Sequence, residues 1–287
     1  MMRVLVTGSK GMLGTSVSKV FKDHDLLLTN STELDVRNFD QVMSWAKSKP
    51  NVILHLAAET DLVRAEFNPG DAYMTNHTGT LNMAHLAETL NVPIVYIGTA
   101  GIFDGKKKIY KEEDKANPLH HYGRSKYYGE LAVKQYKKHY IVRAGWAMGG
   151  GPEVDKKFIN KIYKLAKSGA KKLYGINDMY GNPTYTMDFA MTLKNIVEKR
   201  PEYGTYNSGG KGSASRLAVL KEFIKLLGLS KKIEIIPVTD KEFCKLFPSG
   251  YPKTGSEVLS IKKLEKSGLS AMRDWQSALA EYAKEFI

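Results

Sequence analysis

The sequence predicts an α/β fold built on a doubly wound parallel sheet of the Rossmann type. Short apolar runs alternate with stretches of helical periodicity through the first half of the chain, which is the pattern of βαβ units. The first apolar run, residues 4–6, leads into glycines at 8, 11 and 14 and then into an amphipathic stretch over 15–22. A strand, a glycine turn and a helix in this order are typical of a sheet that binds a dinucleotide.

Each glycine of this turn has its own physical task. One makes the tight turn, one lets a pyrophosphate approach the backbone, and one lets the helix pack against the strand. The unpaired N–H groups that open the helix suit a phosphate. The spacing is G-x-x-G-x-x-G, so a glycine-rich turn without a ligand is the alternative. The expected dinucleotide-binding residues of the turn are Gly8, Lys10, Gly11, Met12, Leu13 and Gly14.

Composition predicts an ordinary globular protein. The chain has 287 residues, 43% of them apolar, which allows one large domain or two smaller ones. Its single cysteine, Cys244, excludes a disulfide framework and a zinc cluster, and so fits a reducing compartment. The first residues given do not show a basic region followed by an apolar run of 7–15 residues, and no apolar run approaches the roughly 20 residues that span a bilayer. We expect a cytoplasmic protein with no membrane partner and no metal site.

The net charge of +13 has two interpretations, a surface for nucleic acid or an attraction for phosphorylated small molecules. The lysines are spread along the chain, and the densest clusters, at 106–108 and 171–172, are short. The sequence contains no zinc-finger or RNA-recognition signature. We therefore expect no nucleic-acid partner.

Further apolar runs predict a second buried strand at 25–30 and others at 52–57, 93–99 and 140–142. Predicted helices cover 39–49, with Asn38 as the cap, and 70–90. Ligands of parallel sheets lie beyond the carboxyl ends of the strands. Gly8, Ala57, Thr99 and Arg143 all follow such ends, so we expect them at one edge of the sheet.

The end of the second strand favours NADP. An acidic residue about 20 positions beyond the glycines would bind the ribose of NAD. Here the run ends Leu28-Thr29-Asn30, and Glu33 comes late. Lys10 can pair with a 2′-phosphate. We expect NADPH/NADP as the cofactor, with NADH as the alternative.

A tyrosine and a lysine four positions apart form a candidate catalytic pair. Tyr122 and Lys126 share one face of a predicted helix. A nearby ammonium favours phenolate, so we expect Lys126 to lower the pKa of Tyr122 from about 10. The phenol then acts as general acid toward a carbonyl, and Thr99 can hold the same oxygen. An isolated pair of this kind is more often a solvated helix face, so the prediction depends on the order of all three motifs.

This order resembles the extended short-chain dehydrogenase/reductase superfamily and, within it, the dTDP-4-dehydrorhamnose reductase family. The superfamily pattern is matched at residues 7–14, 55–58, 122–126 and 143. The closer likeness is carried by residues 34–36, 103–105, 122–130, 146 and 176–184. It spans nearly the whole chain and thins after about residue 215.

The resemblance implies roles for the matched residues. The implied catalytic residues are Thr99, Tyr122 and Lys126. Beside the glycine turn, the implied cofactor-binding residues are Asp35 and Val36 near the adenine, Ala57 and Ala58 near the nicotinamide, and Tyr122 and Lys126. The implied substrate-binding residues are Thr99, Trp146, Asn177 and Asp178. Asn76 matches an asparagine that supports the active-site lysine through water. The implied reaction is the NADPH-dependent reduction of the C4 ketone of a nucleotide-linked 4-keto-6-deoxy sugar.

The chain departs from the family pattern near the sugar. Ala100 and Gly101 stand where the family has an aspartate and a tyrosine, Val63 replaces an aspartate, and Tyr251 replaces an arginine. A non-catalytic NADP-binding subunit, like the regulatory subunit of methionine adenosyltransferase that resembles the same family, is therefore one alternative. A sugar-nucleotide epimerase or dehydratase is another. The dehydratase would need an acid at position 100, and an NAD-dependent epimerase would need one after the second strand.

Glycines and a proline at 149–152 mark a domain boundary. We expect a dinucleotide-binding domain over 1–148, with 184–212 returning to it, and a smaller helix-rich substrate lobe over 149–287. Predicted helices of the lobe cover 156–168, 216–227, 238–247, 261–266 and 275–286, the last capped by Asp274, and another ends at 197. Lys156, Lys157 or Lys253 is expected to meet the phosphates of the nucleotide-sugar substrate. The resemblance also allows a homodimer.

Overall fold

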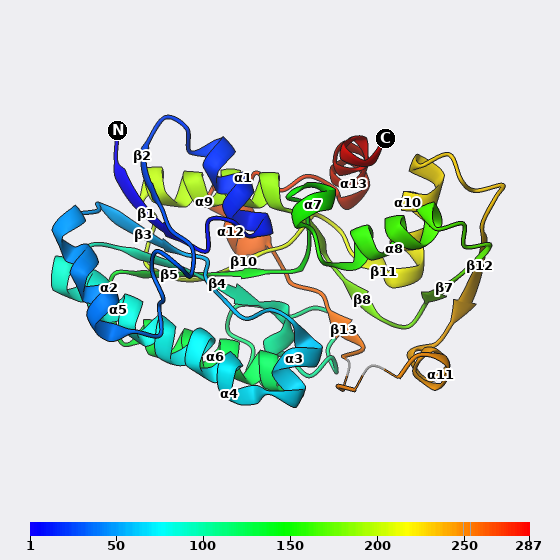
Figure 1. The fold of residues 1–287 in the computed structure, drawn as a ribbon, viewed down its shortest axis with the longest axis horizontal. Helices are drawn as coiled ribbons and strands as arrows, with labels where there is room; N and C mark the ends of the chain where they lie inside the picture. The colour runs from blue at the N-terminus through cyan, green and yellow to red at the C-terminus, as the bar shows by residue number, and fades with distance from the viewer. Residues whose placement is uncertain (249, 253) are drawn as a thin grey trace.

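A six-stranded sheet in which every strand pair is parallel forms the centre of the structure (Figure 1). The computed structural model describes residues 1–248, 250–252 and 254–287. The strand order is β10-β5-β4-β3-β1-β2. The bounds are β1 Arg3–Thr7, β2 Asp25–Leu28, β3 Val52–His55, β4 Ile94–Thr99, β5 His139–Ala144 and β10 Gly204–Ser208. The order reverses direction at β1, which is where such sheets bind their ligands.

Helices cover both faces of this sheet, so the predicted doubly wound α/β fold is confirmed. On one face, α1 (Met12–Val20) packs beside α9 (Thr186–Lys199). On the other lie α2 (Phe39–Ser44), α5 (Gly79–Leu90) and α6 (His121–Lys134), as Figure 1 shows. The strands supply the apolar side chains between these layers, including the fully buried Val4, Leu5 and Val6.

The second strand is not the buried strand that its run of leucines predicts. β2 lies at the edge of the sheet and pairs only with β1 among the described residues. Leu26 and Leu27 are half-buried, and Leu28 is 41% exposed. An edge strand has a neighbour on one side only, so the position in the sheet, and not the apolar run, determines its burial.

The helix predicted over 70–90 is divided into three parts. They are α4 (Pro69–Tyr73), the π-helical turn η2 (Met74–Thr78) and α5. The short helix α3 (Leu62–Phe67) precedes them. Asn76 is fully buried in the π-helical turn, a type of irregularity that often occurs at functional sites.

Two predicted helix caps are confirmed. Asn38 accepts a hydrogen bond from the Gln41 N–H at 3.0 Å, at the start of α2. The helix predicted to 49 continues from α2 as the 3₁₀ turn η1 (Trp45–Ser48). Asp274 accepts from the Ser277 N–H at 2.9 Å, at the start of α13 (Trp275–Ala283), which ends in the 3₁₀ turn η4 (Lys284–Phe286).

The second half contains strands that the expected helix-rich lobe did not include. β7 (Lys172–Ile176) pairs in parallel with β12 (Glu234–Val238). Val238 therefore belongs to a strand, and the helix predicted to begin there starts at Asp240. Both strands are five residues long, too short for their period to stand out in the sequence.

The helices of the lobe are α7 (Gly151–Val154), α8 (Phe158–Lys167), α10 (Arg216–Leu226), α11 (Asp240–Leu246), α12 (Lys262–Lys266) and α13. Its short strands are β6 (Trp146–Met148), β8 (Tyr180–Gly181), β9 (Pro183–Tyr185), β11 (Ala214–Ser215) and β13 (Ser256–Glu257). Helices α8, α10 and α13 enclose an apolar cluster that includes Ile162, Phe223 and Tyr282.

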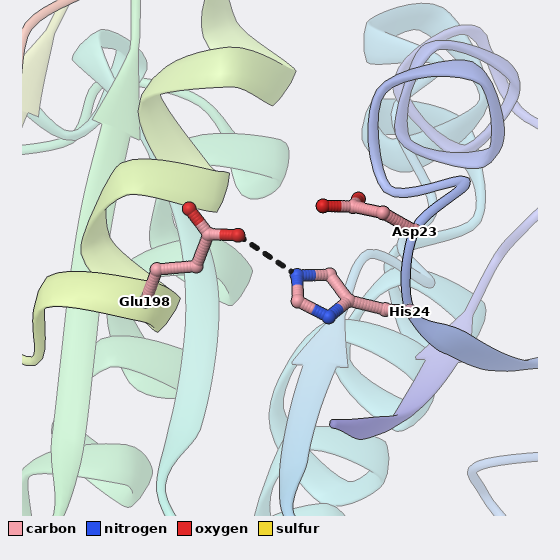
Figure 2. Close-up of side chains that lie close together, drawn as sticks. All are labelled: Asp23, His24 and Glu198. Atoms are coloured by element: carbon pink, nitrogen blue, oxygen red, sulfur yellow. Dashed lines mark hydrogen bonds and ion pairs between the residues drawn. The ribbon is translucent and has the colours of Figure 1, made fainter. Parts of the chain in front are cut away.

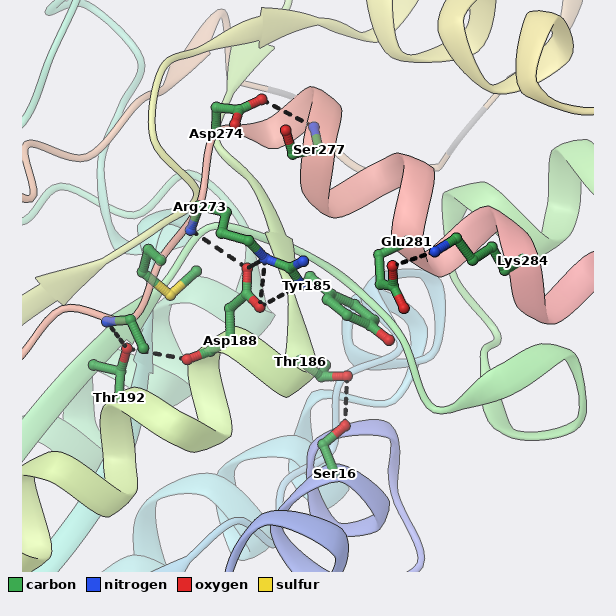
Figure 3. A network of polar contacts seen from close by, with 12 residues as sticks. Ser16, Tyr185, Thr186, Asp188, Thr192, Arg273, Asp274, Ser277, Glu281 and Lys284 are labelled. Atoms are coloured by element: carbon green, nitrogen blue, oxygen red, sulfur yellow. Dashed lines mark hydrogen bonds and ion pairs between the residues drawn. The ribbon is translucent and has the colours of Figure 1, made fainter.

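Segment 184–212 supplies α9 and β10 to the sheet layer, where β10 pairs with β5. Ser16 of α1 donates a hydrogen bond of 2.7 Å to Thr186 of α9 (Figure 3). The same figure shows Arg273 paired with Asp188 at 2.7 Å, which ties the segment before α13 to α9. No described helix is long and apolar enough to cross a membrane.

Candidate active site

The glycine turn leaves no room for side chains. Gly8 has φ +67°, and a Cβ there would lie 2.8 Å from the backbone nitrogen of Ala57. A Cβ on Gly14 would lie 2.4 Å from the Ser9 carbonyl oxygen. Gly11 precedes α1 without a side-chain cap, so the first N–H groups of the helix stay open to a ligand. The turn therefore fits a pyrophosphate, with Met12 and Leu13 opening the helix.

A buried network of polar side chains connects this turn to β3 and to α5. The Thr7 hydroxyl lies 2.8 Å from His55 Nδ1 and accepts hydrogen bonds from the N–H groups of Leu56 and Ala57, both at 3.1 Å. His55 Nε2 lies 3.1 Å from the Thr80 hydroxyl, which donates to the Asn76 carbonyl. Because Thr80 donates its only hydrogen there, Nε2–H donates to Thr80 and Nδ1 accepts from Thr7.

The His55 ring is neutral in this hydrogen-bond network. Burial lowers the pKa of His55 to about 3, and the positive charge of Lys126 acts in the same direction. A neutral ring with one donor and one acceptor can serve Thr7 and Thr80 together. The network places Ala57 against Gly8, and Ala58 follows it. The structure thus brings the two predicted nicotinamide residues to the glycine turn.

Thr99 and Tyr122 lie together at the end of β4. The Thr99 hydroxyl accepts a hydrogen bond from the Gly101 N–H at 3.1 Å and caps the 3₁₀ turn η3 (Ala100–Ile102). Tyr122 lies in the first turn of α6, which His120 caps by accepting from the Gly123 N–H at 2.9 Å. The His120 ring stacks on the Tyr122 ring with a centroid distance of 5.9 Å.

The pKa of Tyr122 is raised, and not lowered as we expected. Burial raises the pKa of Tyr122 to about 12, while the hydrogen bond from Thr99 acts to lower it. Lys126 is buried too, with 4% exposed, and burial lowers the pKa of Lys126 to about 7. Its ammonium lies 4.1 Å from the centroid of the Tyr96 ring. The expectation was wrong for the free protein because burial disfavours the charged form of both groups.

Asn76 supports the helix that carries Lys126. Its Nδ2 donates to the Ser125 hydroxyl and to the Glu59 carbonyl, both at 2.9 Å. Its Oδ1 accepts from the Glu59 N–H at 2.9 Å. The contact is a direct one to the neighbour of Lys126, whereas the family resemblance implies support through water.

Arg143 lies at the expected edge but turns into the protein. It forms an ion pair of 2.8 Å with Glu130 of α6, and both side chains are almost fully buried, at 3% and 0% exposed. It also donates to the Glu112 carbonyl at 3.0 Å. Arg143 therefore holds α6 against β5.

The predicted adenine-side residues have partners of their own. Asp35 pairs with Arg37 at 2.7 Å, and the hydrogen bond from Arg37 lowers the pKa of Asp35. Val36 is buried and packs closely on Gly79, where an added Cβ would lie 2.6 Å from a Val36 side-chain methyl. Lys10 is exposed in the glycine turn. These positions are compatible with the roles we predict for them.

Trp146 lies in the wall of a pocket between β6, α8 and α10, together with Phe158 and Arg216. The Arg216 guanidinium lies 3.5 Å from the centroid of the indole. The indole Nε1–H donates a hydrogen bond to Glu257. Sequence reasoning missed Arg216 and Glu257, since neither belongs to a motif and the chain has 30 acidic residues.

Asn177 and Asp178 are exposed after β7 and contact the segment that leads into α11. The Asn177 N–H donates to the Val238 carbonyl at 2.9 Å, and Asp178 accepts from the Asp240 N–H at 2.8 Å. Within the described chain, no hydrogen bond joins them to Thr99 or Tyr122. Their predicted contact with the substrate stays a prediction.

The predicted phosphate lysines are separated. Lys157 donates to the carbonyl of Thr60 at 2.7 Å and so links the two halves of the chain. Lys156 is exposed. Lys253 lies outside the described residues.

Three potential metal ligands meet outside this site, as Figure 2 shows: Asp23, His24 and Glu198. His24 Nε2 lies 3.1 Å from Glu198. The Lys194 ammonium lies 2.7 Å from Asp23 and 3.7 Å from Glu198. Since an ammonium already neutralises these carboxylates, we assign the group to an ion-pair network between the end of α1 and α9.

Comparison with known proteins places this fold and site in a family. Residues 2–287 match the family described as RmlD substrate binding domain. The chain belongs to this family. A dTDP-4-dehydrorhamnose reductase of Aggregatibacter actinomycetemcomitans is 32% identical, over 97% of both chains. The family predicted from the sequence is confirmed.

Solved structures of the family agree. The crystal structure of a dTDP-4-dehydrorhamnose reductase from Clostridium acetobutylicum has a TM-score of 0.92, with 31% identity over 99% of both chains. That of the dTDP-4-dehydrorhamnose reductase from Bacillus anthracis, in complex with NADP, has a TM-score of 0.90, with 27% identity over 98% of both chains.

Proposed function

We propose that this chain catalyses the NADPH-dependent reduction of the C4 ketone of a nucleotide-linked 4-keto-6-deoxy sugar, the reaction of a dTDP-4-dehydrorhamnose reductase. The observation that carries the proposal is the meeting of Thr99 and Tyr122 at the end of β4, with Lys126 one turn further along α6. The relatives that share the family bear the name of this activity, and one solved structure holds NADP.

The proton comes from Tyr122. NADPH, when bound, supplies the hydride that reaches C4. With a pKa raised to about 12, Tyr122 is protonated at neutral pH and holds the proton that the new C4 oxygen needs. The Thr99 hydroxyl orients the same oxygen and stabilises the phenolate that remains. When protonated, the buried Lys126 adds positive charge to a site from which water is largely excluded.

Cofactor binding is assigned to the glycine turn and its neighbours. Gly8, Gly11 and Gly14 let the pyrophosphate approach the start of α1. Lys10 binds the 2′-phosphate and so favours NADPH over NADH. Asp35 and Val36 lie beside the adenine, and Ala57 and Ala58 beside the nicotinamide.

The two halves of the chain are proposed to bind different ligands. We assign the dinucleotide to residues 1–148 with 184–212, and the nucleotide sugar to residues 149–287, bordered by Trp146, Asn177 and Asp178. The single cysteine, Cys244, supports a reducing compartment, so we propose a cytoplasmic enzyme. A homodimer stays a prediction of the family resemblance.

The alternatives, a dehydratase, an epimerase or a non-catalytic subunit, are less well supported. Ala100 offers no acid for a dehydratase, and Thr29 and Asn30 offer none for an NAD-dependent epimerase. A non-catalytic subunit does not need a phenol held beside a threonine hydroxyl at the strand end.

The test follows NADPH absorbance with purified protein and 4-keto-6-deoxy sugars linked to TDP, UDP and GDP, with NADH in parallel. We expect oxidation with at least one sugar and a loss of about 10²- to 10⁴-fold in kcat for Tyr122→Phe. Tyr128→Phe, an exposed tyrosine on the same helix, is the control. NADPH binding without oxidation for any of the sugars would favour the non-catalytic alternative.

A further inference from the structure

The indole of Trp146 lies between two charged groups from distant parts of the chain. Arg216, the first residue of α10, covers its face, and Glu257 of β13 accepts a hydrogen bond from its Nε1–H. Both side chains therefore contact the same aromatic ring, and Arg216 also lines the pocket beside it. Because Trp146 is only 9% exposed, the ring itself is a fixed platform.

Arg216 is a cation with unused donors. Its guanidinium lies 3.5 Å from the Trp146 centroid and 4.9 Å from that of Phe158. Its backbone N–H donates to the Met179 carbonyl at 3.2 Å, but within the part of the chain that the structure describes its side chain forms no hydrogen bond or ion pair. Burial lowers the pKa of Arg216 to about 10, so the group stays charged at neutral pH. A guanidinium held flat on aromatic rings with its N–H edge free is suited to a phosphate group.

Glu257 acts electrostatically on the residues at the start of α6. Its negative charge raises the pKa of Tyr122 and of His120, the two stacked rings at the start of α6. Among the described residues, the Glu257 side chain makes one hydrogen bond, the one from Trp146, and its negative charge also raises the pKa of Arg216. At the end of β4, Ala100 and Gly101 offer no polar side chain toward the substrate.

The backbone around Glu257 is held from both halves of the molecule. The Ser256 hydroxyl donates to the Lys108 carbonyl at 3.0 Å, and the Tyr110 N–H donates to the Val258 carbonyl at 2.8 Å. On the other side, the Leu259 N–H donates to Asn182 Oδ1 at 2.7 Å. A carboxylate on a backbone fixed in this way is preorganised to meet a ligand.

We propose that Arg216 and Glu257 select the substrate from the two sides of Trp146. Arg216 binds the diphosphate of the sugar nucleotide, and Glu257 accepts a hydrogen bond from the sugar hydroxyl on C3, next to the C4 ketone. This assignment rests on the proposed function and extends it to the groups that the substrate must carry. A site built to accept a hydroxyl rejects an analogue that lacks it, because the carboxylate oxygen that Trp146 does not reach then stays without a donor.

The diphosphate half is tested by calorimetric binding of TDP and UDP to the protein saturated with NADP. We expect Arg216→Met to weaken binding roughly 10- to 100-fold, in line with the loss of a charge-assisted hydrogen bond. Lys221→Met, which removes an exposed positive charge from the same helix, is expected to leave binding within twofold. Retained NADP binding by Arg216→Met shows that the variant is folded. Equal TDP and UDP affinities for Arg216→Met and the wild type would overturn the assignment.

The hydroxyl half is tested by kcat/KM for a 4-keto-6-deoxy sugar nucleotide and its 3-deoxy analogue. We expect the wild type to prefer the 3-hydroxy sugar at least about 100-fold, and Glu257→Gln to lose at least about tenfold of this preference through KM. Glu234→Gln, at an exposed carboxylate of β12, is the control. An unchanged preference in Glu257→Gln would overturn the role of Glu257.

The two measurements separate this inference from the proposed function. Absence of reduction with every sugar, together with TDP binding that depends on Arg216, would reject the reductase and leave the diphosphate site standing. If sugar reduction proceeds and neither substitution changes binding or preference, the proposed reductase function stands and substrate selection by Arg216 and Glu257 is rejected.

Discussion

The ammonium of Lys126 lies 4.1 Å from the centroid of the Tyr96 ring, and the hydroxyl of Tyr96 donates a hydrogen bond of 2.9 Å to the Lys126 carbonyl. One residue of β4 thus holds both ends of the lysine. The side chain is buried with Glu130 as the acidic group that opposes the loss of its charge. In the free protein the lysine is placed by the sheet beneath it, before any cofactor binds.

Stability should therefore depend on pH through Lys126. Its pKa is about 7 in the folded chain and about 10.4 in an unfolded one. Between these values the unfolded chain binds more protons, so the contribution of Lys126 to the free energy of unfolding rises with pH, by up to about 1.4 kcal/mol per unit. Urea unfolding at pH 7, 8 and 9 measures this rise. Lys126→Met should remove it, and equal slopes for the two proteins would contradict the prediction.

Asn76→Ala should affect both stability and turnover. The substitution removes the amide that connects Ser125 of α6 to Glu59, and leaves buried groups without partners. We expect a loss of about 1–3 kcal/mol in the free energy of unfolding and a lower kcat. Asn82→Ala on α5, which removes a buried hydrogen bond to the Val36 carbonyl, is a matched control. It should lower stability to a similar extent with kcat unchanged, so an equal fall of kcat in both variants would contradict the role of Asn76.

The buried pair of Arg143 and Glu130 should show strong coupling. Arg143→Met leaves the Glu130 carboxylate buried without its cation, which typically costs about 3–5 kcal/mol. The double variant Arg143→Met, Glu130→Gln removes the unpaired charge and should recover a large part of that loss. Urea unfolding of the single and double variants measures the coupling. Additive losses would show that the pair does not act as a unit.

Lys10→Ala should reduce the preference for NADPH. An exposed lysine facing the 2′-phosphate contributes at most about 1 kcal/mol, so the ratio of kcat/KM for NADPH and NADH should fall by up to about fivefold. The effect should shrink at high salt, since exposed charges are screened. Lys19→Ala, at the last turn of α1, is the control. If this ratio is unchanged at low salt, Lys10 does not bind the 2′-phosphate, and Arg37 is the next candidate for that role.

Much of the site was predictable because it is local. The glycine turn is determined by a positive φ at Gly8 and by the close approach of backbone at Gly14, and both requirements appear in the sequence as glycines. Tyr122 and Lys126 are brought to one helix face by their spacing. The caps Asn38 and Asp274 depend on residues three positions away.

The failed expectations concern burial and distant contacts. β2 is less buried than predicted because it lies at the edge of the sheet. β7 and β12 are short strands whose paired residues are 62 positions apart, so their pairing could not be predicted from local sequence. We expected the pKa of Tyr122 to be lowered, but it is raised because the ring is buried away from water.

The sequence by itself determined the family, the doubly wound sheet and the order of Thr99, Tyr122 and Lys126, because periodicity, turn sterics and motif spacing act over a few residues. Only the tertiary structure decided that Glu257 meets Trp146 across 111 positions, that Arg216 lies on the same ring, and that Lys126 rests on Tyr96. Charge and desolvation depend on which distant segments share a space, and that is a property of the folded chain.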